Sequence, residues 1–150
     1  MQQKDARQTT GTEEQEHIGS VWLFCPYPVL AKGLAGILSE AASVLVSETL
    51  PEGEMPDCIL VCATSSEEAQ ERVRYARSFV TDAPVIVFGL TSSLPVVRAA
   101  PRAGARGFVH GEMESWQILR AVSIAARGEV VVPRDLLRDI LAEDETVNLE

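Results

Sequence analysis

The sequence predicts an α/β protein with a doubly wound parallel sheet, and two observations carry that prediction. Five short apolar runs recur along the chain, and segments with helical spacing of apolar residues separate most of them. The runs are apolar at consecutive positions, which is typical of parallel strands that helices cover on both faces. With 150 residues, 46% of them hydrophobic, the chain is long enough to bury one core.

The first half of the chain contains three predicted strands and one helix. Pro26 and Pro28 end the first strand, and apolar residues three or four positions apart then form a helical stripe. The strands are expected at Val21–Cys25, Ser43–Ser47 and Cys58–Cys62, and the helix at Val29–Ala41.

The second half alternates helices and strands more regularly. A helix begins near Thr64, where Ser65 and Glu68 have the spacing of a capping box. Gly128 ends a strongly amphipathic helix that begins at Ser115. The remaining predicted elements are strands at Val85–Phe88 and Arg106–Val109 and a last helix at Arg134–Glu143.

Prolines shorten two connections. The link ETLPEGEMPD, residues 48–57, holds two prolines and a glycine, so we expect no full helix between Ser47 and Asp57. Pro101 falls within the helix before the last strand. Because proline inside a helix removes a donor and clashes with the preceding turn, we expect that helix to span only about Pro95–Ala100.

Residues 99–137, AAPRAGARGFVHGEMESWQILRAVSIAARGEVVVPRDLL, resemble the end of a response-regulator receiver domain of the NarL/LuxR type. The resemblance covers roughly Gly19 to Ala142 and is looser in the first half. It implies a flavodoxin-like, five-stranded parallel sheet in the order 2-1-3-4-5. It also implies a bacterial transcription regulator of two-component signalling.

The chain departs from the family where the phosphorylation chemistry is carried. The resemblance places Cys25 and Pro26 at the acid pair, Cys62 at the phosphoacceptor, Gly89 at the hydroxyl residue and Gly111 at the lysine. A thiol, a proline and two glycines do not supply the oxygen ligands that magnesium requires. We therefore expect a pseudo-receiver, independent of phosphorylation, with no metal and no cofactor.

Cys25 and Cys62 are open to two interpretations. The resemblance makes their strands neighbours, and ligands bind at this edge of open α/β sheets. They are either a redox-sensing or metal-binding thiol pair or two small hydrophobic residues that fill the emptied pocket. A third hypothesis is that the pocket receives a small molecule. His110 is expected to be a structural or surface residue that points away from the position of the missing lysine.

No catalytic residues are predicted. The charged residues Glu67, Glu68, Glu71, Arg72 and Arg74 look like a solvated helix face, and no nucleophile elbow, P-loop or dinucleotide fingerprint occurs. We therefore expect a regulatory module that is not an enzyme.

A homodimer is expected to use the helix Ser115–Arg127, alone or together with the first helix, as in receivers of this type. The predicted contact residues are Trp116, Leu119, Arg120 and Ser123. A net charge of −9 argues against binding of nucleic acid by this chain itself, so DNA would be bound through a C-terminal domain absent from it. A protein or small molecule is the expected effector.

The expected organisation is an acidic disordered tail at residues 1–18, a pseudo-receiver domain at 19–128 and a linker helix at 129–150 that leads toward a DNA-binding domain. No run of about 18 apolar residues and no signal peptide is seen, so we expect no membrane partner. Three cysteines without regular spacing favour a reduced, cytoplasmic setting.

Overall fold

The computed structural model describes residues 17–132 and Arg138. It contains one five-stranded parallel sheet in the order β2-β1-β3-β4-β5, so the predicted fold is confirmed. The strands are β1 (Gly19–Phe24), β2 (Ala42–Val46), β3 (Cys58–Cys62), β4 (Val85–Gly89) and β5 (Gly107–His110). β3, β4 and β5 are buried along their whole length, which fits strands covered on both faces.

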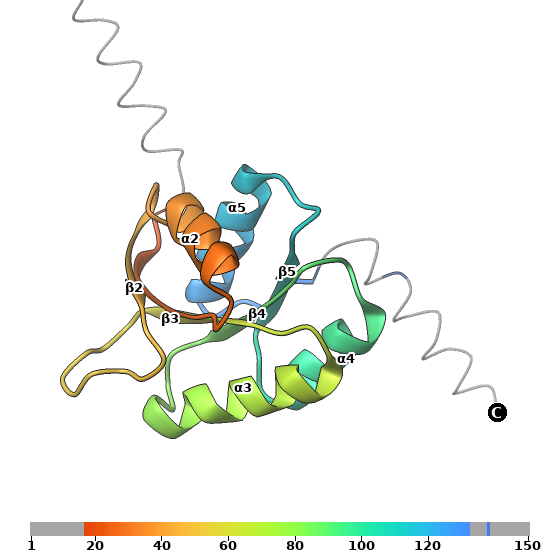
Figure 1. Ribbon diagram of the computed structural model, residues 1–150, viewed down its shortest axis with the longest axis horizontal. Helices are drawn as coiled ribbons and strands as arrows, with labels where there is room; N and C mark the ends of the chain where they lie inside the picture. The colour runs from red at the N-terminus through yellow and green to blue at the C-terminus, as the bar shows by residue number, and fades with distance from the viewer. Residues whose placement is uncertain (1–16, 133–137, 139–150) are drawn as a thin grey trace, which may run out of the picture.

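Two helices lie on each side of the sheet (Figure 1). α2 (Pro28–Leu38) and α5 (Ser115–Ala126) cover one face, and α3 (Ser66–Phe79) and α4 (Leu94–Arg102) cover the other. Each face has its own apolar cluster, one around Trp22 and Phe108 and the other around Leu23 and Val109. None of the helices among the described residues is long and apolar enough to cross a membrane.

The connection from β2 to β3 holds no helix, as predicted, and projects from the sheet as a loop (Figure 1). α4 corrects the second proline prediction, because it continues past Ala100 to Arg102 and includes Pro101. Pro101 lies in the last turn, where proline disturbs only the final helical hydrogen bonds.

Both ends of the described segment belong to the folded body. Ile18 was predicted to be the last residue of the disordered tail. It is instead buried, and its N–H donates to the carbonyl of Ala41 at 3.0 Å. Val131 bridges Gly107 in parallel with β5, so the sheet continues beyond Gly128. Residues 129–132, which were predicted to begin the linker helix, are not helical. Residues 1–16 of the predicted tail, and residues 133–150 of the predicted linker apart from Arg138, lie outside the described residues.

Candidate functional site

The five positions of the emptied pocket gather at the carboxyl edge of the sheet. Cys25 and Pro26 follow β1, Cys62 ends β3, Gly89 ends β4 and Gly111 follows β5. In parallel sheets this edge is where loops form ligand sites. The structure therefore brings together the positions that the resemblance assigned to one pocket.

Cys25 and Cys62 contact each other across neighbouring strands. The register pairs Phe24 with Val61, so Cys25 and Cys62 are the next residues along the two neighbouring strands, and both pack in the same apolar cluster. Burial raises the pKa of the Cys62 thiol, and the adjacent Cys25 raises it further, against a smaller opposing effect of Arg72. Cys25 is half-buried, and its thiol points at the carbonyl of Tyr27 at 3.5 Å. Neither cysteine is in a disulfide in the described structure, and the raised pKa favours the neutral thiol form of Cys62.

Backbone fills the space beside Gly111. Its N–H donates to the carbonyls of Gly89 at 2.9 Å and of Leu90 at 3.1 Å. A Cβ atom on Gly111 would lie 2.5 Å from the Leu90 carbonyl oxygen, closer than real Cβ contacts allow. The loop after β4 thus lies where a side chain at position 111 would begin, and this arrangement excludes a lysine there.

An aromatic ring limits the space beside Gly89. A Cβ atom on Gly89 would lie 3.1 Å from the Phe108 ring and 3.2 Å from the carbonyl oxygen of Thr91. Phe108 is buried, so its ring occupies the space that a larger residue at position 89 would need. Both glycines are therefore used by the packing of this edge.

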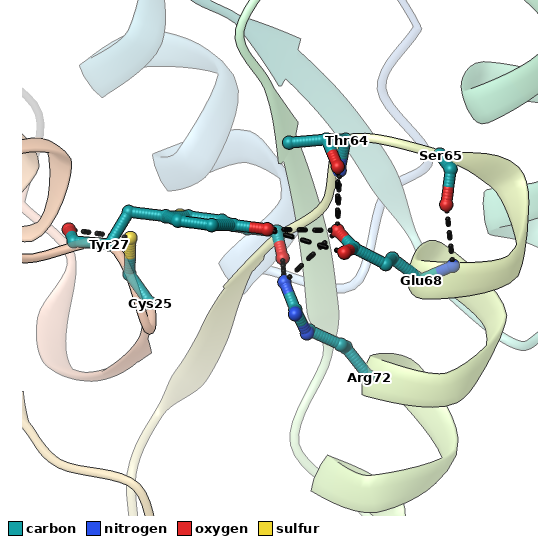
Figure 2. A network of polar contacts seen from close by, with 7 residues as sticks. Cys25, Tyr27, Thr64, Ser65, Glu68 and Arg72 are labelled. Carbon is teal, nitrogen blue, oxygen red and sulfur yellow. Dashed lines mark hydrogen bonds and ion pairs between the residues drawn. The ribbon is translucent and has the colours of Figure 1, made fainter.

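A polar network joins the β1–α2 loop to the start of α3 (Figure 2). The carboxylate of Glu68 accepts hydrogen bonds from the N–H and the hydroxyl of Thr64, both at 2.9 Å, and from the hydroxyl of Tyr27 at 3.1 Å. The bond from the Thr64 N–H is the main cause that lowers the pKa of Glu68, and the hydroxyls and Arg72 lower it further. Ser65 caps α3 by accepting the Glu68 N–H at 3.1 Å.

Arg72 completes this network. Its guanidinium lies 3.4 Å from the Glu68 carboxylate, donates to the carbonyl of Cys62, and stacks 5.6 Å from the centre of the Tyr27 ring. The prediction of a wholly solvated helix face is thus wrong for Glu68 and Arg72, which are partly buried. Their spacing of four residues beside the capping serine was the available signal. The partner Tyr27, 41 residues earlier than Glu68, gave none.

His110 is buried beside the site and has a structural setting. Its Nδ1 accepts the N–H of Glu112 at 3.2 Å, and its own N–H points at the sulfur of Met113 at 3.3 Å. The ring lies 6.0 Å from that of Phe108. Pro26 is exposed at the other side of the edge. Among residues 17–132 and Arg138, no three His, Cys, Asp or Glu side chains are grouped so that they could hold a metal ion.

The predicted dimer residues divide into two classes. The Trp116 side chain is 63% exposed, and Arg120 is also exposed. Ser123 is buried and accepts a hydrogen bond from Arg127 at 3.2 Å, and Leu119 packs in the core cluster beneath α5. Leu119 and Ser123 as placed offer little or no surface to a partner, because both are buried.

The comparisons that match this architecture are with solved structures. No protein-family model and no curated protein matches the sequence. The fold is similar to a two-component response regulator of the LuxR family from Aurantimonas sp. SI85-9A1, with a TM-score of 0.71, 18% identity, and coverage of 83% of this chain and 96% of that one.

Two further solved structures show the same likeness. A LuxR family DNA-binding response regulator from Silicibacter pomeroyi has a TM-score of 0.63 and 24% identity over 77% of this chain and 98% of that one. The signal receiver domain of the putative response regulator NarL from Mycobacterium tuberculosis has a TM-score of 0.61 and 20% identity over 76% and 99%. At these identities the likeness is one of fold, and the chain therefore has the fold of response-regulator receiver domains.

Proposed function

We propose that this chain is a regulatory module of a bacterial transcription regulator whose conformation does not depend on aspartyl phosphorylation. One observation carries the proposal: the pocket is occupied by the protein itself. The Leu90 carbonyl takes the space of a side chain at position 111, and thiols stand at the positions that the resemblance assigns to the phosphoacceptor and one of the acids. A thiol pair and a backbone carbonyl offer neither an acceptor carboxylate nor a cation to stabilise an acyl phosphate.

Phosphorylation by a small phosphodonor tests this proposal. We expect no mass gain after incubation with acetyl phosphate and magnesium, while a receiver domain with the full acid set, treated alongside, gains one phosphate. We also expect no saturable change in the NMR signals of Cys25 and Cys62 on titration with magnesium. A stoichiometric phosphate on the chain would overturn the proposal.

Signal output without a phosphate requires another contact, and we propose self-association through α5. Trp116 lies in the first turn of this helix, and α2, which packs against α5, exposes 86% of Val29 in its own first turn. Exposed aromatic residues of this kind are frequent anchors of protein interfaces. Because no phosphate is needed to form this face, the dimer is expected to depend on concentration alone.

A thiol-based redox response is the second candidate, and the contact between Cys25 and Cys62 favours it. A hydroperoxide would be the oxidant: its O–O bond breaks and takes up the two thiol hydrogen atoms, which gives water and an alcohol. The two sulfur atoms form the Sγ–Sγ bond. Neighbouring strands lie about 4.8 Å apart, within the range of Cα spacing that disulfides tolerate. The raised pKa of Cys62 opposes this chemistry, because the thiolate is the reactive form.

Mass spectrometry after peroxide treatment tests the candidate. A loss of two hydrogen atoms that Cys25→Ser abolishes and Cys58→Ser preserves would support it. Sulfenic or higher acids on Cys25, with no disulfide to Cys62, would exclude it.

A further inference from the structure

One end of the sheet lacks a helix on one of its faces. On the face that carries α3 and α4, these helices pack on β3, β4 and β5. The other two strands, β1 and β2, lie at the far end of the sheet beside the helix-free connection from β2 to β3. There the cover consists of that loop and of aromatic side chains, so this part of the sheet has the thinnest apolar cover.

Four aromatic rings close over this end. Trp22 is fully buried, with its ring 5.4 Å from that of Phe79, and Phe24 lies 5.0 Å from Tyr75. Tyr75 and Phe79, which are four residues apart on α3, remain 37% and 41% exposed. The Tyr75 hydroxyl donates to the carbonyl of Glu48 at 2.8 Å and holds the loop against the rings. Tyr75 and Phe79, with the partly buried Phe24, therefore present an apolar surface to solvent, and Trp22 lies beneath them.

Two hollows follow one another along β1 on this surface. A hollow of about 250 Å³ is lined by the apolar residues Trp22, Leu45 and Leu50 and by the polar residues Ser20, Ser43 and Glu54. A second hollow, of about 260 Å³, is lined by Phe24, Tyr75, Glu71 and Arg72. Trp22 and Phe24 are two residues apart on one strand, so their Cα atoms are separated by about 7 Å. Side chains four residues apart on a helix are separated by about 6 Å along its axis. Apolar side chains of one docked helix can therefore lie over both of these positions along β1.

The rim of this surface is acidic. Glu54 lines the first hollow and Glu71 the second, and both are exposed. Glu48 and Glu52 are exposed in the same loop. The cation at the rim, Arg72, already makes an ion pair with Glu68 and donates to the carbonyl of Cys62. The surface thus complements a ligand with positive charges beside its apolar side chains.

Segments of the chain itself do not match this requirement. Residues 1–16, MQQKDARQTTGTEEQE, carry no apolar stripe of helical spacing. Residues 133–150 contain six acidic and two basic side chains, so their charge does not complement an acidic rim. A helix from another protein meets the spacing and the charge.

We propose that the surface formed by Phe24, Leu45, Leu50, Tyr75 and Phe79 above the buried Trp22, here called the aromatic face, docks an amphipathic helix of a partner protein. Apolar side chains of that helix enter the two hollows, and its lysine or arginine residues face Glu54 and Glu71.

A synthetic peptide tests the proposal without knowledge of the partner. The probe is a helical peptide of about 18 residues with leucines at i and i+4 spacing and lysines beside them, since shorter helices are marginal in water. The control peptide has glutamate in place of each lysine. We expect the lysine peptide to bind with NMR shifts at Tyr75 and Phe79, and the glutamate peptide to bind more weakly.

Variants on one helix give the matched comparison. Glu71→Lys is expected to weaken the lysine peptide about fivefold or more and to favour the glutamate peptide, because it reverses a charge at the rim. Glu67→Lys makes the same change one turn earlier on α3, away from the hollows, and is expected to leave binding nearly unchanged. Phe79→Ser is expected to weaken the lysine peptide about tenfold, with circular dichroism as the folding control.

Several outcomes would overturn the proposal. These are no binding of the lysine peptide, equal effects of Glu67→Lys and Glu71→Lys, or shifts that map to another surface. Self-association in sedimentation velocity that Phe79→Ser abolishes would also overturn it, because the occupant would then be a second copy. Each readout is independent of phosphorylation and of α5.

Discussion

At the scale of the residue, Gly111 decides what the carboxyl edge can hold. Its N–H donates to two carbonyls of the loop after β4, and the Leu90 oxygen lies where a Cβ would be. Restoring the lysine that the receiver chemistry requires would therefore first have to displace that loop. A side chain at position 111 is therefore excluded by the position of the Leu90 backbone.

Gly111→Ala is expected to destabilise the protein by about 2 kcal/mol or more, because the new methyl group meets a backbone oxygen that cannot turn away. The control is Gly36→Ala on α2, where a Cβ atom meets nothing within 4 Å and the change is expected to stabilise the helix by about 0.5–1 kcal/mol. Urea unfolding measures both. A Gly111→Ala variant as stable as the wild type would show that the loop moves freely.

Buried thiols make stability depend on alkaline pH. Burial, and then the neighbouring Asp57 carboxylate, raise the pKa of Cys58 from 9.0 to about 12. The unfolded chain ionises this thiol near its ordinary pKa while the folded chain keeps it neutral. The stabilisation is therefore complete below pH 9 and is lost as the pH rises toward 12.

The expected slope is a fall of about 1 kcal/mol per pH unit in the free energy of unfolding for one such thiol. Urea titrations at several alkaline pH values measure it. Cys58→Ala is expected to be less stable at neutral pH but to lose this part of the slope. An unchanged slope in the variant would assign the effect to other groups.

At the scale of the element, α4 shows how far local rules reach. Two prolines in its sequence led to a predicted helix that ended at Ala100, yet the helix continues through Pro101 to Arg102. Its buried residues Val97 and Ala100 pack over the sheet and compensate for the lost hydrogen bond. Tertiary packing therefore extended the helix where the local pattern ended it.

Pro101→Ala is expected to stabilise the protein by about 1 kcal/mol, because it restores a helical N–H donor and relieves a clash in the last turn. Pro95→Ala is the control. Pro95 lies in the first turn, where a helix N–H has no partner within the helix, so its replacement is expected to have little effect. Thermal melts distinguish the two, and equal effects would contradict this account.

The strands and most helices could be predicted from the sequence, because each buried strand is a continuous apolar run bounded by prolines, glycines or charges. The strand order came from the resemblance, since the apolar pattern does not say which strands are neighbours. Leu119 and Ser123 were predicted as dimer contacts although both are buried, because the rotation of α5 about its axis depends on its packing against α2. The bond from Tyr27 to Glu68 was missed because it joins distant segments.

At the scale of the whole molecule, Trp116 is the residue that tests the proposed dimer. Trp116→Arg places a charge in the proposed contact and is expected to weaken self-association about tenfold or more. The fold should survive, because this side chain is 63% exposed in the monomer. Sedimentation velocity over a range of concentrations measures the effect.

Val130→Arg is the matched control, because it adds the same charge at another exposed apolar residue outside α5. It is expected to leave the association unchanged. A wild-type protein that stays monomeric at high concentration, or a Trp116→Arg variant that dimerises normally, would remove α5 as the interface.

The bridge between Val131 and Gly107 affects how the protein associates with other copies of itself. The N–H of Val131 donates to the Arg106 carbonyl at 2.9 Å, and its carbonyl accepts the Phe108 N–H at 3.0 Å. Without Val131, the Arg106 carbonyl and the Phe108 N–H would be unpaired groups at the edge of the sheet, and such groups can pair with a strand from another chain. The residues after α5 thus seal this margin of the sheet. We expect a chain truncated after Gly128 to expose this edge of β5 and to associate with other copies by strand pairing. In a sedimentation experiment that association would be mistaken for a regulatory dimer.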